Sequence, residues 1–119
     1  MFSLHHVQLA IPVHGEDRAR GFYGDVLGLE EVPKPRELAA RGGAWFRAGG
    51  LEIHLGVEEP FAPAKKAHPG ILTDHLDALQ ARLGDAGVEV RPDDLFPGFR
   101  RFYVDDCFGN RLEFLQPGP

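Results

Sequence analysis

The sequence has little of several features that define common protein classes. Its 119 residues include a single cysteine, Cys107, so no intramolecular disulfide can form and a reducing compartment is expected. No apolar run approaches the roughly 20 residues that cross a bilayer. The start of the chain, MFSLHHVQL, lacks the charged region and the cleavage site of a signal peptide. We therefore expect a cytoplasmic protein without a membrane partner.

Positive charge and reactive-site motifs are also scarce. Thirteen lysines and arginines stand against 18 aspartates and glutamates, which gives a net charge of −5, and no basic tract occurs. A nucleic-acid surface held by counterion release is therefore not expected. The glycine pairs at 42–43 and 49–50 lack the strand-to-helix context of a phosphate-binding loop, and no serine or cysteine nucleophile signature occurs. The chemistry left is that of metal, carboxylate and imidazole.

What the sequence contains is one order of elements that occurs twice. In the first half, alternation predicts a strand over 5–11. Apolar residues at i, i+3, i+4 and i+7, Phe22 and Tyr23 among them, predict an amphipathic helix over 16–27 that ends at Gly28 and packs these rings in the core. Three strands follow, with a loop or short helix after the first and a glycine turn between the last two, at 29–32, 44–48 and 51–57.

The second half repeats this order. A strand over 68–73 precedes a helix with a leucine stripe, for which Asp74 is the expected cap, and the run GVEV follows at 87–90. A closing hairpin over 101–105 and 111–116 completes the half. We expect one domain with an α+β fold, made of two tandem βαβββ modules at 1–59 and 66–119 with a linker at 60–65.

Four good metal ligands fall at matching places in the two halves. The early strand of each half carries His6 or His68, which are 62 residues apart, and a late strand carries His54 or Glu113, which are 59 apart. Alternation puts His6 and His54 on the polar faces of their strands. A duplicated unit with a ligand at each matched position can bring all four together.

Other residues are candidates for the same polar face. Arg101 and Tyr103 are expected to hold an anionic or carbonyl-bearing substrate, because a guanidinium binds carboxylate or phosphate in a fixed fork. Trp45 and Arg47 alternate with apolar residues and either line the substrate site or face solvent. A lone histidine is usually an ordinary polar residue, and we interpret those outside the matched set in this way: His5, His14 and His75.

Three runs of sequence, HHVQLAI, FYGDVLGLEEV and GNRLEFLQ, resemble the vicinal oxygen chelate superfamily. That superfamily includes glyoxalase I, extradiol dioxygenases, fosfomycin-resistance enzymes and bleomycin-resistance proteins, and the likeness extends from about Leu4 to Gln116. The resemblance implies paired modules that form a cup-shaped mixed sheet around a divalent metal, with helices on the outer face. It also implies a homodimer that completes the sites.

The resemblance places His6, His68 and Glu113 at the family's ligand positions, with Glu113 also as the catalytic carboxylate. His54 stands at the fourth position, where glyoxalase I enzymes commonly have glutamate. Such a set suits Zn, Ni, Mn, Co or Fe, and two histidines with one carboxylate also form the facial arrangement of non-haem iron.

Three functions are compatible with these residues. The first is a metal-dependent lyase, isomerase, transferase or dioxygenase whose small substrate binds the metal through neighbouring oxygens. The second is a drug- or metabolite-binding protein of the bleomycin-resistance type, without turnover. The third is a structural dimer in which the histidines take no part. Metal analysis separates the first from the second, because a site of this kind should bind metal tightly.

Overall fold

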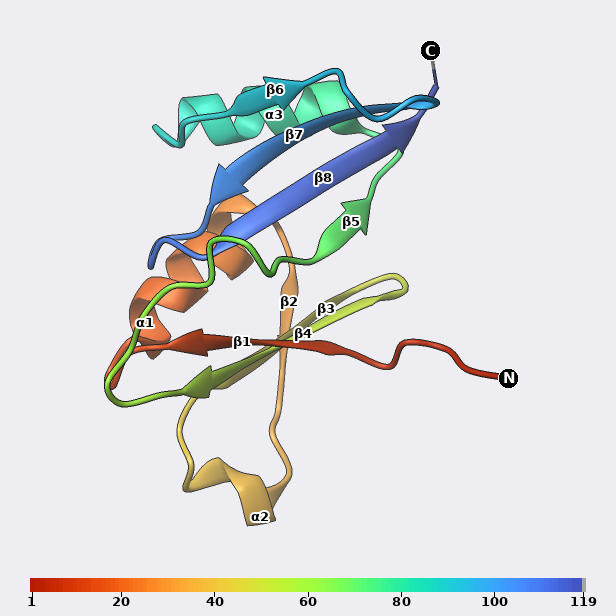
Figure 1. Ribbon diagram of the computed structural model, residues 1–119. Helices are drawn as coiled ribbons and strands as arrows, with labels where there is room; N and C mark the ends of the chain where they lie inside the picture. The colour runs from red at the N-terminus through yellow and green to blue at the C-terminus, as the bar shows by residue number, and fades with distance from the viewer. Residues whose placement is uncertain (119) are drawn as a thin grey trace. The chain divides into compact units, whose positions relative to one another are not determined.

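The computed structural model describes residues 1–118 and divides into two compact units, Met1–Ala64 and Lys65–Pro119. Each unit contains one four-stranded mixed sheet and its own helical segment (Figure 1). The predicted α+β fold of two β-rich units is therefore confirmed. None of the helices in the described chain has the length and apolar character that a bilayer crossing requires.

The sheet of the first unit has the strand order β1-β4-β3-β2. β1 runs parallel to β4, and the other neighbours are antiparallel. The hairpin predicted from the Gly49-Gly50 pair is confirmed, and Gly49 has the positive φ of +54° that its turn requires. The elements of this unit are β1 Val7–Ile11, α1 Glu16–Ala19, η1 Arg20–Val26, β2 Glu30–Val32, α2 Arg36–Ala39, β3 Ala44–Ala48 and β4 Leu51–Val57.

The helix predicted over 16–27 differs in type from the expectation. It begins as one α-helical turn, α1, and continues as the π-helix η1, in which the N–H of Leu27 bonds to the carbonyl of Phe22. Two glycines, Gly21 and Gly24, lie in this wider part, where the missing Cβ relaxes the limits on the backbone. The predicted end at Gly28 is confirmed, with φ of +78°.

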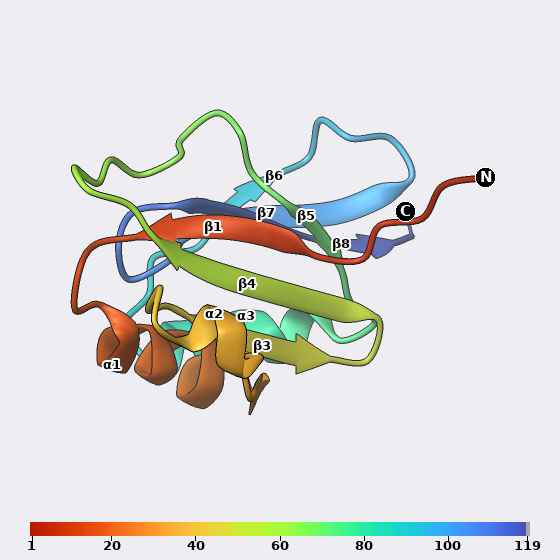
Figure 2. The same cartoon turned by 90° about the horizontal axis from the view of Figure 1, so that it is seen from below.

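The core of the first unit lies between the helical segment and one face of the sheet (Figure 2). Tyr23, Phe46 and Ile53 are fully buried, and the rings of Tyr23 and Phe46 lie 5.7 Å apart. Burying such side chains contributes about 1.5–3 kcal/mol each. This core fixes which face of β3 and β4 is left for polar residues.

The second unit has the corresponding strand order, β5-β8-β7-β6, with β5 parallel to β8. Leu83 from α3 and the strand residues Phe102, Val104 and Leu112 are buried, so the helix covers the apolar face of its own sheet. The elements are β5 Gly70–Leu72, α3 Leu76–Asp85, β6 Arg91–Asp93, β7 Phe99–Asp105 and β8 Arg111–Pro117.

Two local expectations for this unit were wrong. Asp74 does not cap α3; the N–H of Leu76 instead donates to Gln116 Oε1 on β8, and the N–H of His75 donates to Thr73 Oγ1. The run GVEV at 87–90, expected to supply the strand that follows the helix, is not a strand, and β6 begins at Arg91. The reason is that the N–H of Val88 bonds back to the carbonyl of Leu83 and so belongs to the end of the helix.

Candidate functional site

The predicted ligands of the second unit, His68 and Glu113, are in direct contact. Glu113 lies on β8 with only 6% of its surface exposed, and Oε1 of its carboxylate is 2.8 Å from Nε2 of His68. The other ring nitrogen of His68, Nδ1, is 2.8 Å from the backbone carbonyl of Lys66. Because a carbonyl only accepts, Nδ1 carries a proton. In the neutral imidazole, the lone pair of Nε2 therefore points at a carboxylate oxygen.

Two acceptors that face each other at this distance require a cation between them. A proton satisfies the pair by forming the imidazolium, and a metal ion satisfies it by taking both lone pairs. The bond from Nδ1 to a backbone carbonyl is the usual way in which a ligating histidine is held in orientation. His68 Nε2 and Glu113 Oε1 thus face each other directly.

Arg101, predicted to hold substrate, is engaged by two carboxylates of its own unit. Nη1 donates to Glu113 Oε2 at 2.9 Å, while Nε and Nη2 donate to Asp93 Oδ1 at 3.1 and 3.0 Å. The pKa of Arg101 is raised, mainly by Glu113, and the pKa of Asp93 is lowered by the N–H of Leu95 and by Arg101. A substrate anion would have to displace one of these partners.

Aromatic rings surround this group. The guanidinium carbon of Arg101 lies 5.2 Å from the ring centroids of both Phe96 and Tyr103. Tyr103 stands opposite Glu113 in the β7–β8 register, and its ring meets that of His68 edge-on with centroids 5.6 Å apart. The predicted residues Arg101 and Tyr103 therefore share one face with His68 and Glu113.

In the first unit the predicted ligands, His6 and His54, are stacked rather than convergent. His54 is 4% exposed, and its ring lies between those of His6 and Trp45, with centroid separations of 3.9 and 3.8 Å and interplanar angles of 17° and 3°. An imidazole binds metal through a lone pair in the plane of its ring. Parallel planes keep the lone pairs of His6 and His54 from meeting at one point as the rings stand.

Sequence reasoning missed Glu52, which lies beside this stack. Its Oε2 accepts a hydrogen bond of 2.7 Å from His54 Nε2, and this bond lowers the pKa of Glu52. Strand alternation was the available signal, because residues 52 and 54 point to the same face of β4. The first unit therefore has a carboxylate two residues from the position where the resemblance led us to expect one.

The remaining residues of this face are more exposed. Arg47, a predicted substrate contact, is exposed and stands opposite Glu52 in the β3–β4 register. His5 precedes β1, which begins at Val7 rather than at the expected residue 5, and Nδ1 of His5 is 2.9 Å from Nδ1 of His6. Partial desolvation, with the nearby imidazoles of His54 and His5, lowers the pKa of His6 and favours the neutral form that binds metal.

Within residues 1–118, no three histidine, cysteine, aspartate or glutamate side chains form a group that could hold a metal ion as they stand. The structure brings the predicted ligands together in two pairs: His6 with His54, and His68 with Glu113. Only the second pair presents its donor atoms to a common point.

Comparison with known proteins identifies the family. The model of the Glyoxalase/Bleomycin resistance protein/Dioxygenase superfamily matches residues 3–114. A protein from Bacillus anthracis assigned to the glyoxalase family is 48% identical over 99% of this chain and 97% of its own, with a TM-score of 0.96. No protein of curated function matches the chain by sequence.

More distant structures share the fold. The fosfomycin resistance protein FosX from Mesorhizobium loti is 19% identical over 99% of this chain and 94% of its own, with a TM-score of 0.71. The antibiotic-binding protein TnmS3 from a Streptomyces species is 24% identical over 99% of both chains, with a TM-score of 0.75. The chain described here belongs to the Glyoxalase/Bleomycin resistance protein/Dioxygenase superfamily.

Proposed function

We propose that this protein is a metal-dependent enzyme whose small substrate binds the metal through two neighbouring oxygens. The contact between His68 Nε2 and Glu113 Oε1 carries the proposal, because it sets two acceptors against each other at 2.8 Å. The hydrogen bond from Nδ1 to the backbone carbonyl of Lys66 supports the proposal, because it leaves Nε2 as the nitrogen that a metal would use.

The separation of the two donors fits a divalent ion. Two ligands at adjacent corners of an octahedron, with bonds of about 2.1 Å, lie roughly 3 Å apart. The observed separation of 2.8 Å is close to this value. Imidazole nitrogen and carboxylate oxygen are donors that Zn, Ni, Mn, Co and Fe all accept. His6 and His54 are proposed as ligands in the first unit, and their rings would turn out of the stack to bind a metal.

The residues around Glu113 divide its two oxygens between different tasks. Arg101 holds Oε2, which leaves Oε1 toward His68 for the metal. Arg101 is thus proposed as a positioning residue, and Glu113 as the carboxylate at which a proton of the substrate is held or released. When bound, the metal would act as a Lewis acid that polarises the substrate oxygens.

The reaction class depends on the metal. Iron would suit oxygen-dependent ring cleavage, whereas Zn, Ni, Mn or Co would suit lyase, isomerase or transferase chemistry. Metal analysis of the protein, stripped with a chelator and reconstituted with each metal in turn, tests the proposal. We expect about one equivalent of a divalent metal and its loss in Glu113→Gln, with Glu37→Gln, an exposed carboxylate on α2, as the control. Less than about 0.1 equivalent in the wild type would overturn it.

A second candidate is a binding protein that sequesters a small molecule without turnover. The observation in its favour is the ion pair of Arg101 with Glu113, since it neutralises the carboxylate when no metal is bound. An antibiotic-binding protein also has this fold. If this function is correct, Glu113→Gln should leave small-molecule binding unchanged while metal uptake stays negligible.

A cytoplasmic homodimer is part of the proposal. Each sheet ends in edge strands that have one neighbour within their own unit, and Leu72 on β5 is 67% exposed. Exposed edges and apolar side chains of this kind favour pairing between chains. Sedimentation of the purified protein should give twice the mass of one chain, and a monomer would contradict this part.

A further inference from the structure

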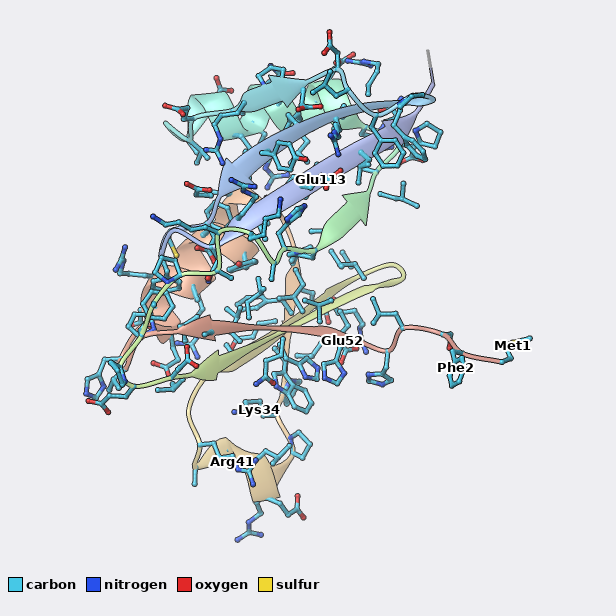
Figure 3. All side chains as sticks on the ribbon, viewed as in Figure 1. Met1, Phe2, Lys34, Arg41, Glu52 and Glu113 are labelled. Atoms are coloured by element: carbon cyan, nitrogen blue, oxygen red, sulfur yellow. The ribbon has the colours of Figure 1, made fainter. Side chains whose placement is uncertain are left out.

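The first unit contains a cavity of about 260 Å³ beside the stacked rings. Its walls include the side chains of Gln8, Lys34, Leu38, Arg41 and Trp45. Figure 3 shows Lys34 and Arg41 on the side of β4 where α2 lies. Two cationic side chains from one loop region therefore border a hollow next to Trp45.

Neither of these cations is paired with a carboxylate among the described residues. Lys34 Nζ donates to the backbone carbonyl of Gly42, which is neutral, and Arg41 is exposed with no ion pair. No aspartate or glutamate of the described chain lines the cavity. The carboxylate of Glu16 lies beside Gly42, where it accepts a hydrogen bond of 2.8 Å from the N–H of Gly43. The two cations of the cavity thus form no ion pair with a described carboxylate, in a protein whose net charge is −5.

Three other arginines of this protein are neutralised by carboxylates. Arg20 is bonded to Asp17 and Glu31, Arg100 to Asp77, and Arg101 to Asp93 and Glu113 in the second unit. The lysine and arginine of the cavity differ from these because their charge is still available to a ligand. An anion with several oxygens is the ligand that such a pair of donors fits.

The backbone is shaped to hold this loop against the sheet. Gly43 has φ of +84°, and a Cβ at this position would lie 2.0 Å from the carbonyl oxygen of Leu55 on β4. Only glycine permits that approach, which brings Arg41 to the rim of the cavity. Gly56 likewise leaves room for the side chain of Gln8, which would lie 2.7 Å from a Cβ there.

The cavity adjoins the proposed ligands of the first unit. Trp45 forms one of its walls and stacks on His54, with ring planes 3° apart. Trp45 thus contacts both the cavity and the histidine stack. The apolar side chain of Leu38 supplies a further wall.

We propose that this cavity binds an anionic group, a carboxylate or a phosphoryl group, of the small substrate. The assignment of that group to a substrate rests on the proposed function, but the anion site itself stands on the cavity. Lys34 and Arg41 neutralise the anion, and the indole of Trp45 packs against the part of the molecule next to it.

Trp45 is the only tryptophan in the chain, so its fluorescence reports on the cavity. The experiment titrates chelator-treated protein with inorganic phosphate and, separately, with malonate, at constant ionic strength. We expect a saturable change in the wild type and about tenfold weaker binding in Arg41→Met and in Lys34→Met, the loss of one charge-assisted hydrogen bond. Arg36→Met, which removes an exposed cation from α2 outside the cavity, is the control and should bind as the wild type does.

The outcomes separate the two proposals. Tighter binding of phosphate assigns a phosphoryl group, and tighter binding of malonate assigns a carboxylate. An unsaturable response, or an equal loss in Arg36→Met, overturns the anion site. Because no metal is present in this titration, failure of metal uptake by His68 and Glu113 would overturn the enzyme and leave the anion site standing. Lys34→Arg, which keeps the charge, should retain binding if Lys34→Met loses it through charge rather than through misfolding.

Discussion

The two units have the same strand order but different polar faces. In each, the first strand runs parallel to the last, in the pairs β1–β4 and β5–β8. In the second unit the predicted ligands are bonded to each other, while in the first they are stacked as aromatic rings. The repeated topology therefore places these side chains at matching positions of the two sheets. The residues around each side chain determine which contacts it makes.

Charge follows the same division. The second unit pairs Arg101 with Asp93 and Glu113, and these bonds hold the carboxylate of Glu113 in one orientation. The first unit leaves Lys34 and Arg41 without carboxylates beside the stack. We propose that the second unit binds the metal and that the first binds the anion.

The largest effect is expected from removing ligands. His68→Ala and Glu113→Ala should each weaken metal binding by at least about a hundredfold, the upper range for losing even a supporting residue. His54→Ala should weaken metal binding less, because the His54 ring stacks on Trp45 and its Nε2 is hydrogen-bonded to Glu52. Competition titrations with a chromogenic chelator measure all three affinities. A greater loss in His54→Ala than in His68→Ala would reverse the comparison.

Arg101 should give the next largest effect. Arg101→Met removes the bond that orients Oε2 of Glu113, so metal affinity should fall about tenfold although a positive charge next to the ion is lost. Arg100→Met serves as the control, because that arginine pairs with Asp77 away from the ligands. Tighter metal binding in Arg101→Met would instead show that the arginine competes with the metal.

In the first unit, stacking on His54 should contribute to stability. Trp45→Leu should lower the free energy of unfolding by about 1 kcal/mol beyond the effect of lost apolar area, as is typical of an aromatic pair. The effect of Tyr103→Leu on the free energy of unfolding is measured for comparison, because Tyr103 contacts His68 edge-on rather than by stacking. Urea unfolding followed by circular dichroism measures both. Equal stability of Trp45→Leu and the wild type would mean that the stack is not stabilising.

The smallest effect concerns Glu16, which anchors the glycine turn beside the cavity. The N–H of Gly43 lowers the pKa of Glu16 below its ordinary value of 4.5. A lowered carboxyl pKa in the folded state stabilises the protein above the ordinary pKa, and the gain is lost as pH falls through the folded value. Glu16→Ala should lower the free energy of unfolding by about 0.5 kcal/mol at pH 7. This difference from the wild type should disappear at low pH, where Glu16 is protonated.

Unfolding curves between pH 7 and pH 3 measure this dependence, with Glu37→Ala, an exposed carboxylate on α2, as the control. A cost for Glu16→Ala that stays the same down to pH 3 would show that the hydrogen bond from Gly43 does not depend on the charge.

The fold was predictable because it rests on short-range patterns. Alternation placed β3 and β4 at their observed bounds, and Gly28 and Gly49 ended elements as glycines with positive φ. The cap of α3 was not predictable, because its acceptor is Gln116, 40 residues away on another element. Such partners depend on packing rather than on local sequence.

The candidate site was predictable in part. Strand alternation grouped Arg101, Tyr103 and Glu113 on one face, and the register of β7 with β8 agrees. Alternation does not give the orientation of a ring, so the stacking of His54 could not be foreseen. The cavity could not be predicted from the sequence either, because it depends on a loop whose close approach to β4 requires glycine at position 43.

The most direct test of the central claim is a crystal structure of the protein grown with Zn²⁺ or Ni²⁺ and measured at the absorption edge of the metal. We predict an anomalous peak within about 2.2 Å of both His68 Nε2 and Glu113 Oε1. A metal bound elsewhere, with the 2.8 Å contact between these two atoms unchanged, would contradict the account.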